Sequence, residues 1–209
     1  ILKDGLMDVY NNIHMGQCAE HCAKTYNISR EDQDAHAIES YKRVAEAHKN
    51  GHFKAEIVPV TIEGKKGEKV VVTEDEEYKK VNYEKIPSLR PAFDPKGTVT
   101  AANSSKLNDG AAALVLMSGK KARELGMKPL ARVLGFADSA RAPIEFTIAP
   151  TQAVPLALKK AGVSAQEVDY YELNEAFSVI SVANNKILNL DPAKVNLFGG
   201  AVALGHPIG

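Results

Sequence analysis

The sequence predicts an α/β protein, and three observations support this prediction. Strand-like apolar runs alternate with amphipathic helices through the second half of the chain, and a long capped helix followed by a hairpin occupies the first half. The chain has 209 residues, of which 44% are hydrophobic. This apolar content is enough to bury the core of one substantial domain or two small ones.

The first half contains a long helix whose start is indicated by its capping residues. Ser29 and Asp32 have the spacing of a capping box, in which each side chain accepts a hydrogen bond from the backbone N–H of the other residue. The helix is predicted to continue to about His48, with Gly51 just beyond its end.

A hairpin and a charged loop are expected after this helix. Residues 57–62 and 69–73 are strand-like and are separated by Glu63-Gly-Lys-Lys-Gly67, which predicts a β-hairpin. Residues 74–96 are charged and include Pro87, Pro91 and Pro95, so they are expected to form an ordered surface loop.

The second half is expected to alternate strands with helices. Residues 111–117 form a continuous apolar run typical of a buried strand, and residues 130–137 and 168–173 are also strand-like. Helices are expected over residues 119–125 closed by Gly126, over 150–160 stopped by Gly162, and over about 174–188. The chain is then expected to close with a strand and a glycine turn.

The composition gives no reason to expect a nucleic-acid or membrane partner. The 26 Lys and Arg residues offset the 26 Asp and Glu residues, so no excess charge favours an anionic surface. No apolar run approaches the length that spans a bilayer, and the first residues do not resemble a signal peptide. The two cysteines, Cys18 and Cys22, indicate a reducing compartment rather than a disulfide scaffold.

Two sequence patterns suggest sites that simple geometry and chemistry disfavour. His14 and Cys22 lie at the ends of a helical His/Cys cluster, but a rise of about 1.5 Å per residue separates them by roughly 12 Å along the helix axis, too far to share one zinc ion. Cys18 could serve as a nucleophile near a helix N-terminus, although small buried thiols are commoner. Gly200 and Gly205 have P-loop spacing, but His206-Pro207 replaces the lysine and hydroxyl residues that bind phosphate and magnesium.

His206 and Asn174 are the strongest catalytic candidates. His206 stands between Gly205 and Pro207, whose backbone preferences hold a loop that presents an imidazole for hydrogen bonding or proton exchange. Asn174 lies where a predicted strand meets a helix, so it either caps that helix or orients a water or substrate oxygen. Glu175 either gives polar support or favours the helix dipole.

Several short motifs occur in one order along the whole chain and together resemble the thiolase family. They are His14-Met-Gly16, Thr98-Val-Thr-Ala-Ala-Asn103, Leu107-Asn-Asp-Gly-Ala111, Asn174-Glu-Ala-Phe177, Gly199-Gly-Ala201 and Gly205-His-Pro-Ile-Gly209. The resemblance implies a thiolase-like layered α-β-α-β-α fold, here incomplete. It also implies a CoA-binding loop domain over residues 1–107, the end of the N-terminal half over 108–126, and a truncated C-terminal half over 127–209.

The resemblance further implies acetyl-CoA C-acetyltransferase activity, an acyltransferase reaction. Two acetyl-CoA molecules condense to acetoacetyl-CoA and CoA, or the reverse thiolysis occurs, through an acyl-cysteine intermediate. Both catalytic cysteines of the family are expected outside these residues, so the chain by itself is expected to be inactive. The alternatives are a 3-ketoacyl-CoA thiolase of broader chain length and a non-catalytic CoA-binding homologue.

The resemblance assigns roles to residues in the motifs. His206 donates to the thioester oxygen and helps activate the nucleophile, and Asn174 holds a water that completes the oxyanion site. The positions that match CoA contacts are His14, Lys80, Val81, Asn82, Lys85 and Ser105. The positions that match the carbonyl ligands of a potassium ion in mitochondrial relatives are Ala101, Ala102, Ser104 and Val202, with His36 in place of a tyrosine ligand.

The resemblance also implies the setting of the complete protein. A mitochondrial homotetramer is expected, with roles in fatty acid and ketone body metabolism and in isoleucine degradation. The absent part of the family's sheet is expected to leave apolar faces of this chain exposed, which predicts aggregation or partial order when the chain is produced alone.

Overall fold

The computed structural model describes residues 1–208, and Gly209, the last residue of the glycine-rich motif, lies outside them. The described helices are α1 (Leu2–Gly5), α2 (Met15–Tyr26), α3 (Arg30–Lys49), α4 (Gly119–Glu124), α5 (Pro150–Ala161), α6 (Ser178–Leu188) and α7 (Ala201–Leu204). Short 3₁₀ helices are η1 (Glu77–Lys79), η2 (Tyr83–Ser88), η3 (Pro143–Ile148), η4 (Ala165–Glu167) and η5 (Pro192–Lys194). The strands form two antiparallel pairs, β1 (Met7–Asp8) with β2 (Ile13–His14) and β3 (Val60–Glu63) with β4 (Lys69–Val72).

The long helix α3 begins at the capping box that the sequence predicts. Asp32 N–H donates to Ser29 Oγ at 3.0 Å, and Ser29 N–H donates to Asp32 Oδ2 at 3.1 Å. These two bonds satisfy backbone donors that the first turn of a helix leaves without partners. The helix ends at Lys49, so the predicted start and approximate end are both confirmed.

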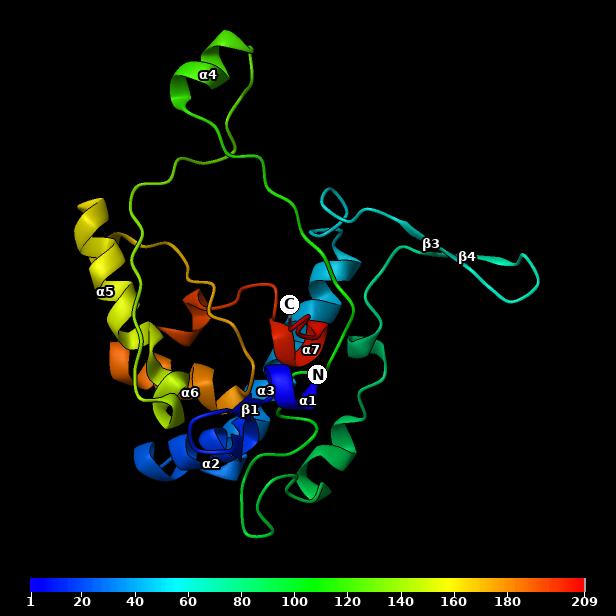
Figure 1. The fold of residues 1–209 in the computed structure, drawn as a ribbon, viewed down its shortest axis with the longest axis vertical. Helices are drawn as coiled ribbons and strands as arrows, with labels where there is room; N and C mark the ends of the chain where they lie inside the picture. The colour runs from blue at the N-terminus through cyan, green and yellow to red at the C-terminus, as the bar shows by residue number, and fades with distance from the viewer. Residues whose placement is uncertain (209) are drawn as a thin grey trace.

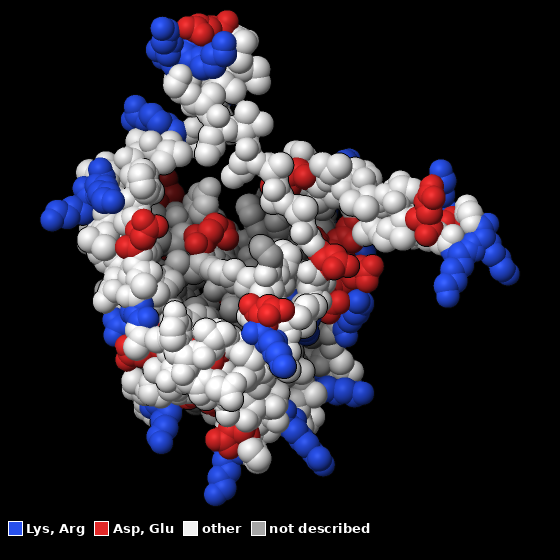
Figure 2. Space-filling view, viewed as in Figure 1, with Lys and Arg blue, Asp and Glu red and all other residues white. Residues whose placement is uncertain are grey.

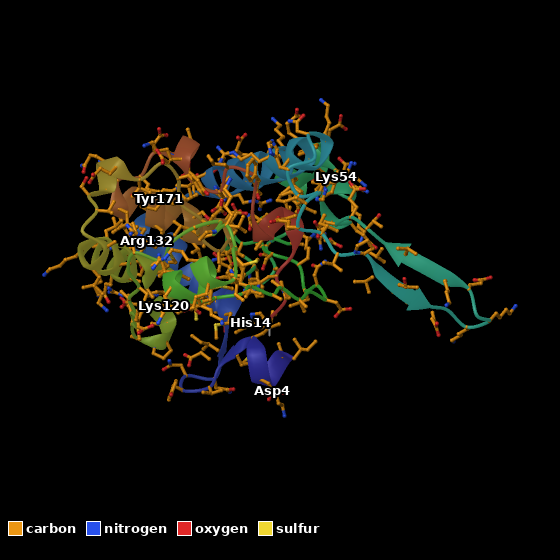
Figure 3. All side chains as sticks on the ribbon, turned by 90° about the horizontal axis from the view of Figure 1, so that it is seen from above. Asp4, His14, Lys54, Lys120, Arg132 and Tyr171 are labelled. Carbon is orange, nitrogen blue, oxygen red and sulfur yellow. The ribbon has the colours of Figure 1, made fainter. Side chains whose placement is uncertain are left out.

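The predicted hairpin is also confirmed, with Val60 opposite Val72 and Glu63 opposite Lys69. It extends away from the body of the molecule in both ribbon views (Figures 1 and 3). Its apolar side chains are therefore exposed, including Ile62 and Val70. Pairing between the two strands satisfies the inner backbone groups, but the outer edges face no other described strand.

The core consists of two apolar clusters built mainly by helices. In the first, Cys22 and Ala19 of α2 pack with Val179 and Ala183 of α6. In the second, Tyr41 and Val44 of α3 pack with Val202 and Ala203 of α7. Because α3 also packs against α6, the two clusters are joined into one body, with the N-terminus near α7 (Figure 1).

Several predicted strands and boundaries are wrong in this structure. Residues 111–117 and 130–137 are irregular and exposed, with Leu114 88% and Val115 85% exposed. Only Tyr171 of residues 168–173 makes a bridge, to Val195. A strand needs a partner for its backbone N–H and C=O groups, and among residues 1–208 no described segment supplies one. These extended runs carry α4 away from the body in Figure 1.

The end of the chain also differs from the prediction. The helix expected from about residue 174 begins at Ser178, and the last element is the helix α7 rather than a strand. Gly200 precedes α7 with an extended backbone. Local apolar content alone does not distinguish a buried strand from a short buried helix, and here the helical alternative packs against α3.

The surface is mixed in charge. Figure 2 shows lysine and arginine interspersed with aspartate and glutamate over the face in view, with basic side chains at the hairpin tip and around α4. Over residues 1–208, no helix is both long enough and apolar enough to cross a membrane.

The exposed apolar runs lead to a prediction about the 209-residue chain produced by itself. We expect it to aggregate or to be partly ordered, because residues such as Leu114, Leu130 and Phe136 expose most of their apolar surface to water. Size-exclusion chromatography with light scattering, followed by thermal unfolding, checks this. A soluble monomer with one sharp unfolding transition would contradict the prediction.

Candidate active site

The site is organised by residues 98–107, here called the central segment, which connects the predicted catalytic motifs. On one side it pairs with the Asn174–Phe177 motif and the residue that follows. Ser105 N–H donates to Ala176 O at 3.0 Å, and Ser178 N–H donates to Asn103 O at 2.8 Å. These bonds place the motif against the central segment although more than 70 residues separate them in the sequence.

Helices α2 and α3 hold the central segment in place. The Glu20 carboxylate of α2 accepts from the backbone N–H groups of Thr98 and Val99, at 2.9 and 2.8 Å. The buried Asn103 side chain donates to Asp34 Oδ1 of α3 at 2.9 Å and accepts from the backbone of Thr100 at 2.8 Å. Charge-assisted bonds from part-buried backbone donors make the segment a well-held support.

The other end of the central segment holds His206. The His206 N–H donates to Lys106 O at 2.8 Å, and Leu107 and His206 form a parallel bridge. Gly205 has a φ of 102°, and a Cβ there would lie 2.2 Å from the side-chain amide of Asn108. Only glycine suits this backbone, so the residue before the imidazole is positioned by both torsion and packing.

His206 lines a cleft of about 520 Å³. The other described residues that line it are Ile1, Asp4, Gly5, Leu107, Asn108, Asp109, Gly110, Pro207 and Ile208. The sequence prediction that the Gly-His-Pro loop presents its imidazole, rather than burying it in the core, agrees with this position.

Asn174 does not cap a helix, because α6 begins at Ser178 with Phe177 at its N-cap position. That alternative is therefore wrong. The Asn174 side chain is exposed, and it is not among the described residues that line the cleft beside His206. The central segment connects the two candidates through backbone pairing, but the structure does not bring Asn174 into that cleft.

Glu175 has long-range partners that the sequence analysis did not identify. Its carboxylate is buried, and Oε1 lies 3.0 Å from His36 Nε2 and accepts from Asn196 Nδ2 at 2.9 Å. Oε2 accepts from Ser40 Oγ at 2.7 Å and from Val202 N–H at 3.3 Å. These four partners come from α3, from the loop before α7 and from α7 itself, so both carboxylate oxygens are fully used.

The same contacts set the protonation of Glu175. Burial opposes the charged form and would raise its pKa, but hydrogen bonds from His36, Asn196 and Ser40 outweigh burial, and the pKa lies below its ordinary value. Glu175 therefore acts as a buried carboxylate, which is the polar support that the sequence offered as one alternative. The helix α6 starts three residues later, and the hydrogen-bond partners of the carboxylate lie on α3, at residue 196 and in the first turn of α7.

Gly200 shows how closely α7 approaches this carboxylate. A Cβ at Gly200 would lie 2.4 Å from Glu175 Cδ, and the Gly200 N–H donates to Ser40 Oγ at 3.1 Å. Glu175 thus anchors the start of the short helix that leads to Gly205 and His206. Two features of the sequence could have indicated this role. Glu175 is a carboxylate next to an apolar helix, and Gly199-Gly200 leave room for a close approach just before residue 201.

His14, the first of the predicted CoA contacts, has a structural role as well. It is the N-cap of α2, where Gly16 N–H donates to its Nδ1 at 3.0 Å, and its ring stacks on Phe93 with centroids 4.7 Å apart. Burial lowers the pKa of His14, which favours the neutral imidazole. Figure 3 labels His14 where the N-terminal segment joins the body of the molecule.

Of the remaining predicted CoA contacts, Ser105 belongs to the central segment, and the others lie on the surface segment that carries η1 and η2: Lys80, Val81, Asn82 and Lys85. Lys80 pairs with Glu77 at 2.7 Å and Glu76 at 3.2 Å, and these carboxylates raise its pKa. Asn82 accepts from the backbone of Lys85 and so caps η2. Val81 packs against the α3 and α7 cluster, which places this segment beside the helix that leads to His206.

The cysteines and the His/Cys cluster do not form a reactive or metal site. Cys18 and Cys22 are free and buried, and burial raises the pKa of both thiols. A raised pKa leaves little thiolate, so Cys18 is not suited to act as a nucleophile. No group of three or more His, Cys, Asp or Glu among the described residues is placed to bind a metal ion.

The four predicted carbonyl ligands of potassium come from two places. Ala101, Ala102 and Ser104 belong to the central segment, and Val202 belongs to α7. The carbonyls of Ala101 and Ser104 already accept hydrogen bonds from the side chain of Lys106.

Comparison with known proteins shows which family this chain resembles along its whole length. Residues 1–120 match the family described as "Thiolase, N-terminal domain", and residues 127–209 match "Thiolase, C-terminal domain". The chain is 57% identical to the mitochondrial acetyl-CoA acetyltransferase of Mus musculus and to the acetyl-CoA acetyltransferase of Yarrowia lipolytica. Both matches cover 100% of this chain but 50% and 52% of the relative, so the chain spans about half the length of the curated relatives it matches.

Solved structures agree with the sequence matches. The acetyl-CoA acetyltransferase of Bacillus anthracis superposes with a TM-score of 0.94 at 42% identity, over 97% of this chain and 52% of that one. A thiolase from Ascaris suum in complex with coenzyme A has a TM-score of 0.93 at 50% identity, over 99% and 53%. The extended runs that lack partners here therefore follow the path of a larger layered fold. The chain belongs to the thiolase family and adopts part of the thiolase fold.

Proposed function

We propose that the protein containing this chain is an acetyl-CoA C-acetyltransferase, which condenses two acetyl-CoA molecules to acetoacetyl-CoA and CoA or catalyses the reverse thiolysis. The observation that carries the proposal is the 57% identity, over the whole chain, to relatives named acetyl-CoA acetyltransferases. The rigid support of His206 at a cleft is consistent with it, because an oxyanion donor must be held in place before the reaction.

In this proposal His206 and Asn174 stabilise negative charge during the reaction. The imidazole of His206 donates to the thioester oxygen, and Asn174 orients a water that donates to the same region. Preorganised donors of this kind contribute about 3 kcal/mol each to transition-state stabilisation. The attacking thiolate and the acid/base thiol belong to two further cysteines, since Cys18 and Cys22 are buried thiols with raised pKa values.

We further propose that CoA binds along residues 1–107, treated as a loop domain, while residues 108–126 and 127–209 belong to the two thiolase halves. The contacts proposed for CoA are His14, Lys80, Val81, Asn82, Lys85 and Ser105. Lys80 and Lys85 suit the phosphates as mobile point charges. The place of Val81 beside α7 supports this arrangement, because it brings the segment toward the helix that leads to His206.

The setting of the complete protein is also a proposal. Relatives from Mus musculus and Bos taurus are named mitochondrial, which supports a mitochondrial location. A homotetramer that serves fatty acid, ketone body and isoleucine metabolism is consistent with such a location.

A substrate comparison tests the proposed function. The complete protein is expected to cleave acetoacetyl-CoA with free CoA at a kcat/KM of about 10⁴ M⁻¹ s⁻¹ or more, within the usual enzyme range, and to be much slower on long-chain 3-ketoacyl-CoA. The thiolysis rate is measured from the loss of the 3-ketoacyl-CoA absorbance. Equal rates on both substrates would favour a broad-chain 3-ketoacyl-CoA thiolase, and binding of CoA without turnover would indicate a non-catalytic homologue.

A further inference from the structure

The side chain of Lys106 folds back over the central segment and donates to three oxygen atoms. Its Nζ lies 2.7 Å from Ala101 O, 3.0 Å from Ser104 O and 2.9 Å from the Tyr41 hydroxyl of α3. The three acceptors match the three N–H donors of an ammonium group. The side chain is half-buried, and none of the ion pairs described in residues 1–208 includes Lys106.

The oxygens around this ammonium are neutral. Two are backbone carbonyls, and burial together with the charge of Glu77 raises the pKa of Tyr41 to about 12, so its hydroxyl stays protonated. Burial lowers the pKa of Lys106, and the charge of Glu77 partly opposes this. Neutral oxygens, backbone carbonyls above all, that converge on one positive charge have the chemistry of a site for a monovalent cation.

Potassium, which the resemblance places at these carbonyls, does not fit beside this ammonium. The Ala101 and Ser104 carbonyls already accept from Lys106, and two cations cannot share the same oxygens without strong repulsion. The position that would supply a tyrosine ligand is His36, and its Nε2 is bonded to the Glu175 carboxylate at 3.0 Å. Of the expected potassium ligands, two carbonyls therefore already accept from Lys106, and the tyrosine is replaced by a histidine that is bonded to Glu175.

We propose that the Lys106 ammonium is a built-in monovalent cation that takes the place of potassium at these carbonyls and makes the protein independent of potassium. The proposal explains why the ammonium is bonded to three neutral oxygens rather than to a carboxylate. The carbonyl of the same residue accepts the His206 N–H at 2.8 Å, so the ammonium also steadies the backbone that positions the imidazole. Lys106 is thus a positioning residue for His206, and this part of the proposal rests on the proposed function.

The first test uses the complete wild-type protein in potassium, sodium and choline chloride at one ionic strength. A cation that binds only the folded state raises the unfolding temperature, so without a potassium site we expect the temperatures in the three salts to agree within about 1 °C. The KM for CoA is expected to agree within about twofold. A specific rise in unfolding temperature or a specific fall in KM in potassium would overturn the proposal.

The second test removes the charge with Lys106→Met, which keeps a side chain of similar length. In choline chloride the variant is expected to unfold about 3 °C or more below the wild type, and potassium is expected to restore part of this loss because the carbonyls are then free to bind it. Lys120→Met, at a lysine that is 83% exposed on α4, is the matched control and should respond equally to all three salts. The same loss in every salt, with no recovery in potassium, would refute the assignment of a cation site.

The unfolding measurements do not depend on turnover. If the complete protein lacks thiolase activity, the proposed function fails, while the salt dependence of unfolding still decides the role of Lys106. If Lys106→Met does not fold, the comparison of salts on the wild type remains decisive.

Discussion

Replacing His206 with alanine in the complete protein is expected to lower kcat by on the order of a hundredfold or more, with a smaller effect on the KM for CoA. The imidazole is proposed to donate to an oxygen that gains negative charge in the transition state, so its loss affects turnover more than ground-state binding. Steady-state kinetics of acetoacetyl-CoA thiolysis give both constants. Near-normal turnover in the variant would remove His206 from the proposed mechanism.

The structure indicates that this variant keeps its fold. The contact that positions residue 206 is its backbone N–H, which donates to Lys106 O, and alanine retains that N–H. The free energy of unfolding is therefore expected to change by less than about 1 kcal/mol. His21→Ala is a matched control, because His21 is a partly exposed histidine of α2 whose Nε2 lies 3.4 Å from the Thr25 hydroxyl. It should leave kcat unchanged.

Replacing Glu175 with alanine is expected to have the largest effect on stability, about 3–5 kcal/mol of unfolding free energy. The buried carboxylate accepts from Asn196, Ser40 and the Val202 N–H and bonds to His36, so its removal leaves several buried polar groups without partners. Urea unfolding of the complete protein measures the change. Turnover is expected to fall as well, because α7 would lose the anchor that precedes His206.

Two further variants serve as comparisons, one that keeps the shape of the Glu175 side chain without its charge and one that removes an exposed carboxylate. Glu175→Gln keeps the length of the side chain and one acceptor oxygen, so it is expected to cost less than Glu175→Ala. Glu39→Ala removes an α3 carboxylate that is 54% exposed and pairs with Arg43, and it should cost less than about 1 kcal/mol. Equal losses for Glu39→Ala and Glu175→Ala would show that the buried network does not carry the predicted stability.

The pH dependence of stability gives the sign of the Glu175 contribution. Because the pKa of Glu175 is lower in the folded state, its charge stabilises the fold above the unfolded-state pKa, and this contribution is lost as the pH falls through the folded-state pKa. The difference in unfolding free energy between the wild type and Glu175→Gln should therefore shrink at acidic pH. A constant difference across that range would contradict the assigned ionisation.

The elements that were predicted correctly are those specified by neighbouring residues. The Ser29 and Asp32 caps mark the start of α3, and the glycine-containing turn after Glu63 marks the hairpin. Gly162 ends α5 in the left-handed conformation, as the sequence indicated. Each of these depends on hydrogen bonds or torsions within a few residues, which a single sequence contains.

The elements that were predicted wrongly depend on partners far away in the sequence. Residues 111–117 and 130–137 have strand-like composition, but a strand forms only where another backbone pairs with it. Glu175 bonds to residues 135 and 139 positions earlier in the chain, which no local pattern reveals. The Lys106 ammonium likewise donates to the hydroxyl of Tyr41, 65 positions earlier in the chain. The motif around Lys106 gives no indication of that contact.

The sequence by itself determined the family, the capped helices and the Gly205-His206-Pro207 loop, because these follow from motifs and short-range backbone preferences. Only the tertiary structure decided that Glu175 anchors α7, that Asn174 does not cap α6, and that the Lys106 ammonium occupies carbonyls assigned to potassium. These outcomes depend on which side chains meet after the chain has folded. A buried polar group without a hydrogen-bond partner is energetically costly, so the fold must bring partners together from distant parts of the chain. Long-range packing therefore specifies the site, and local sequence patterns do not.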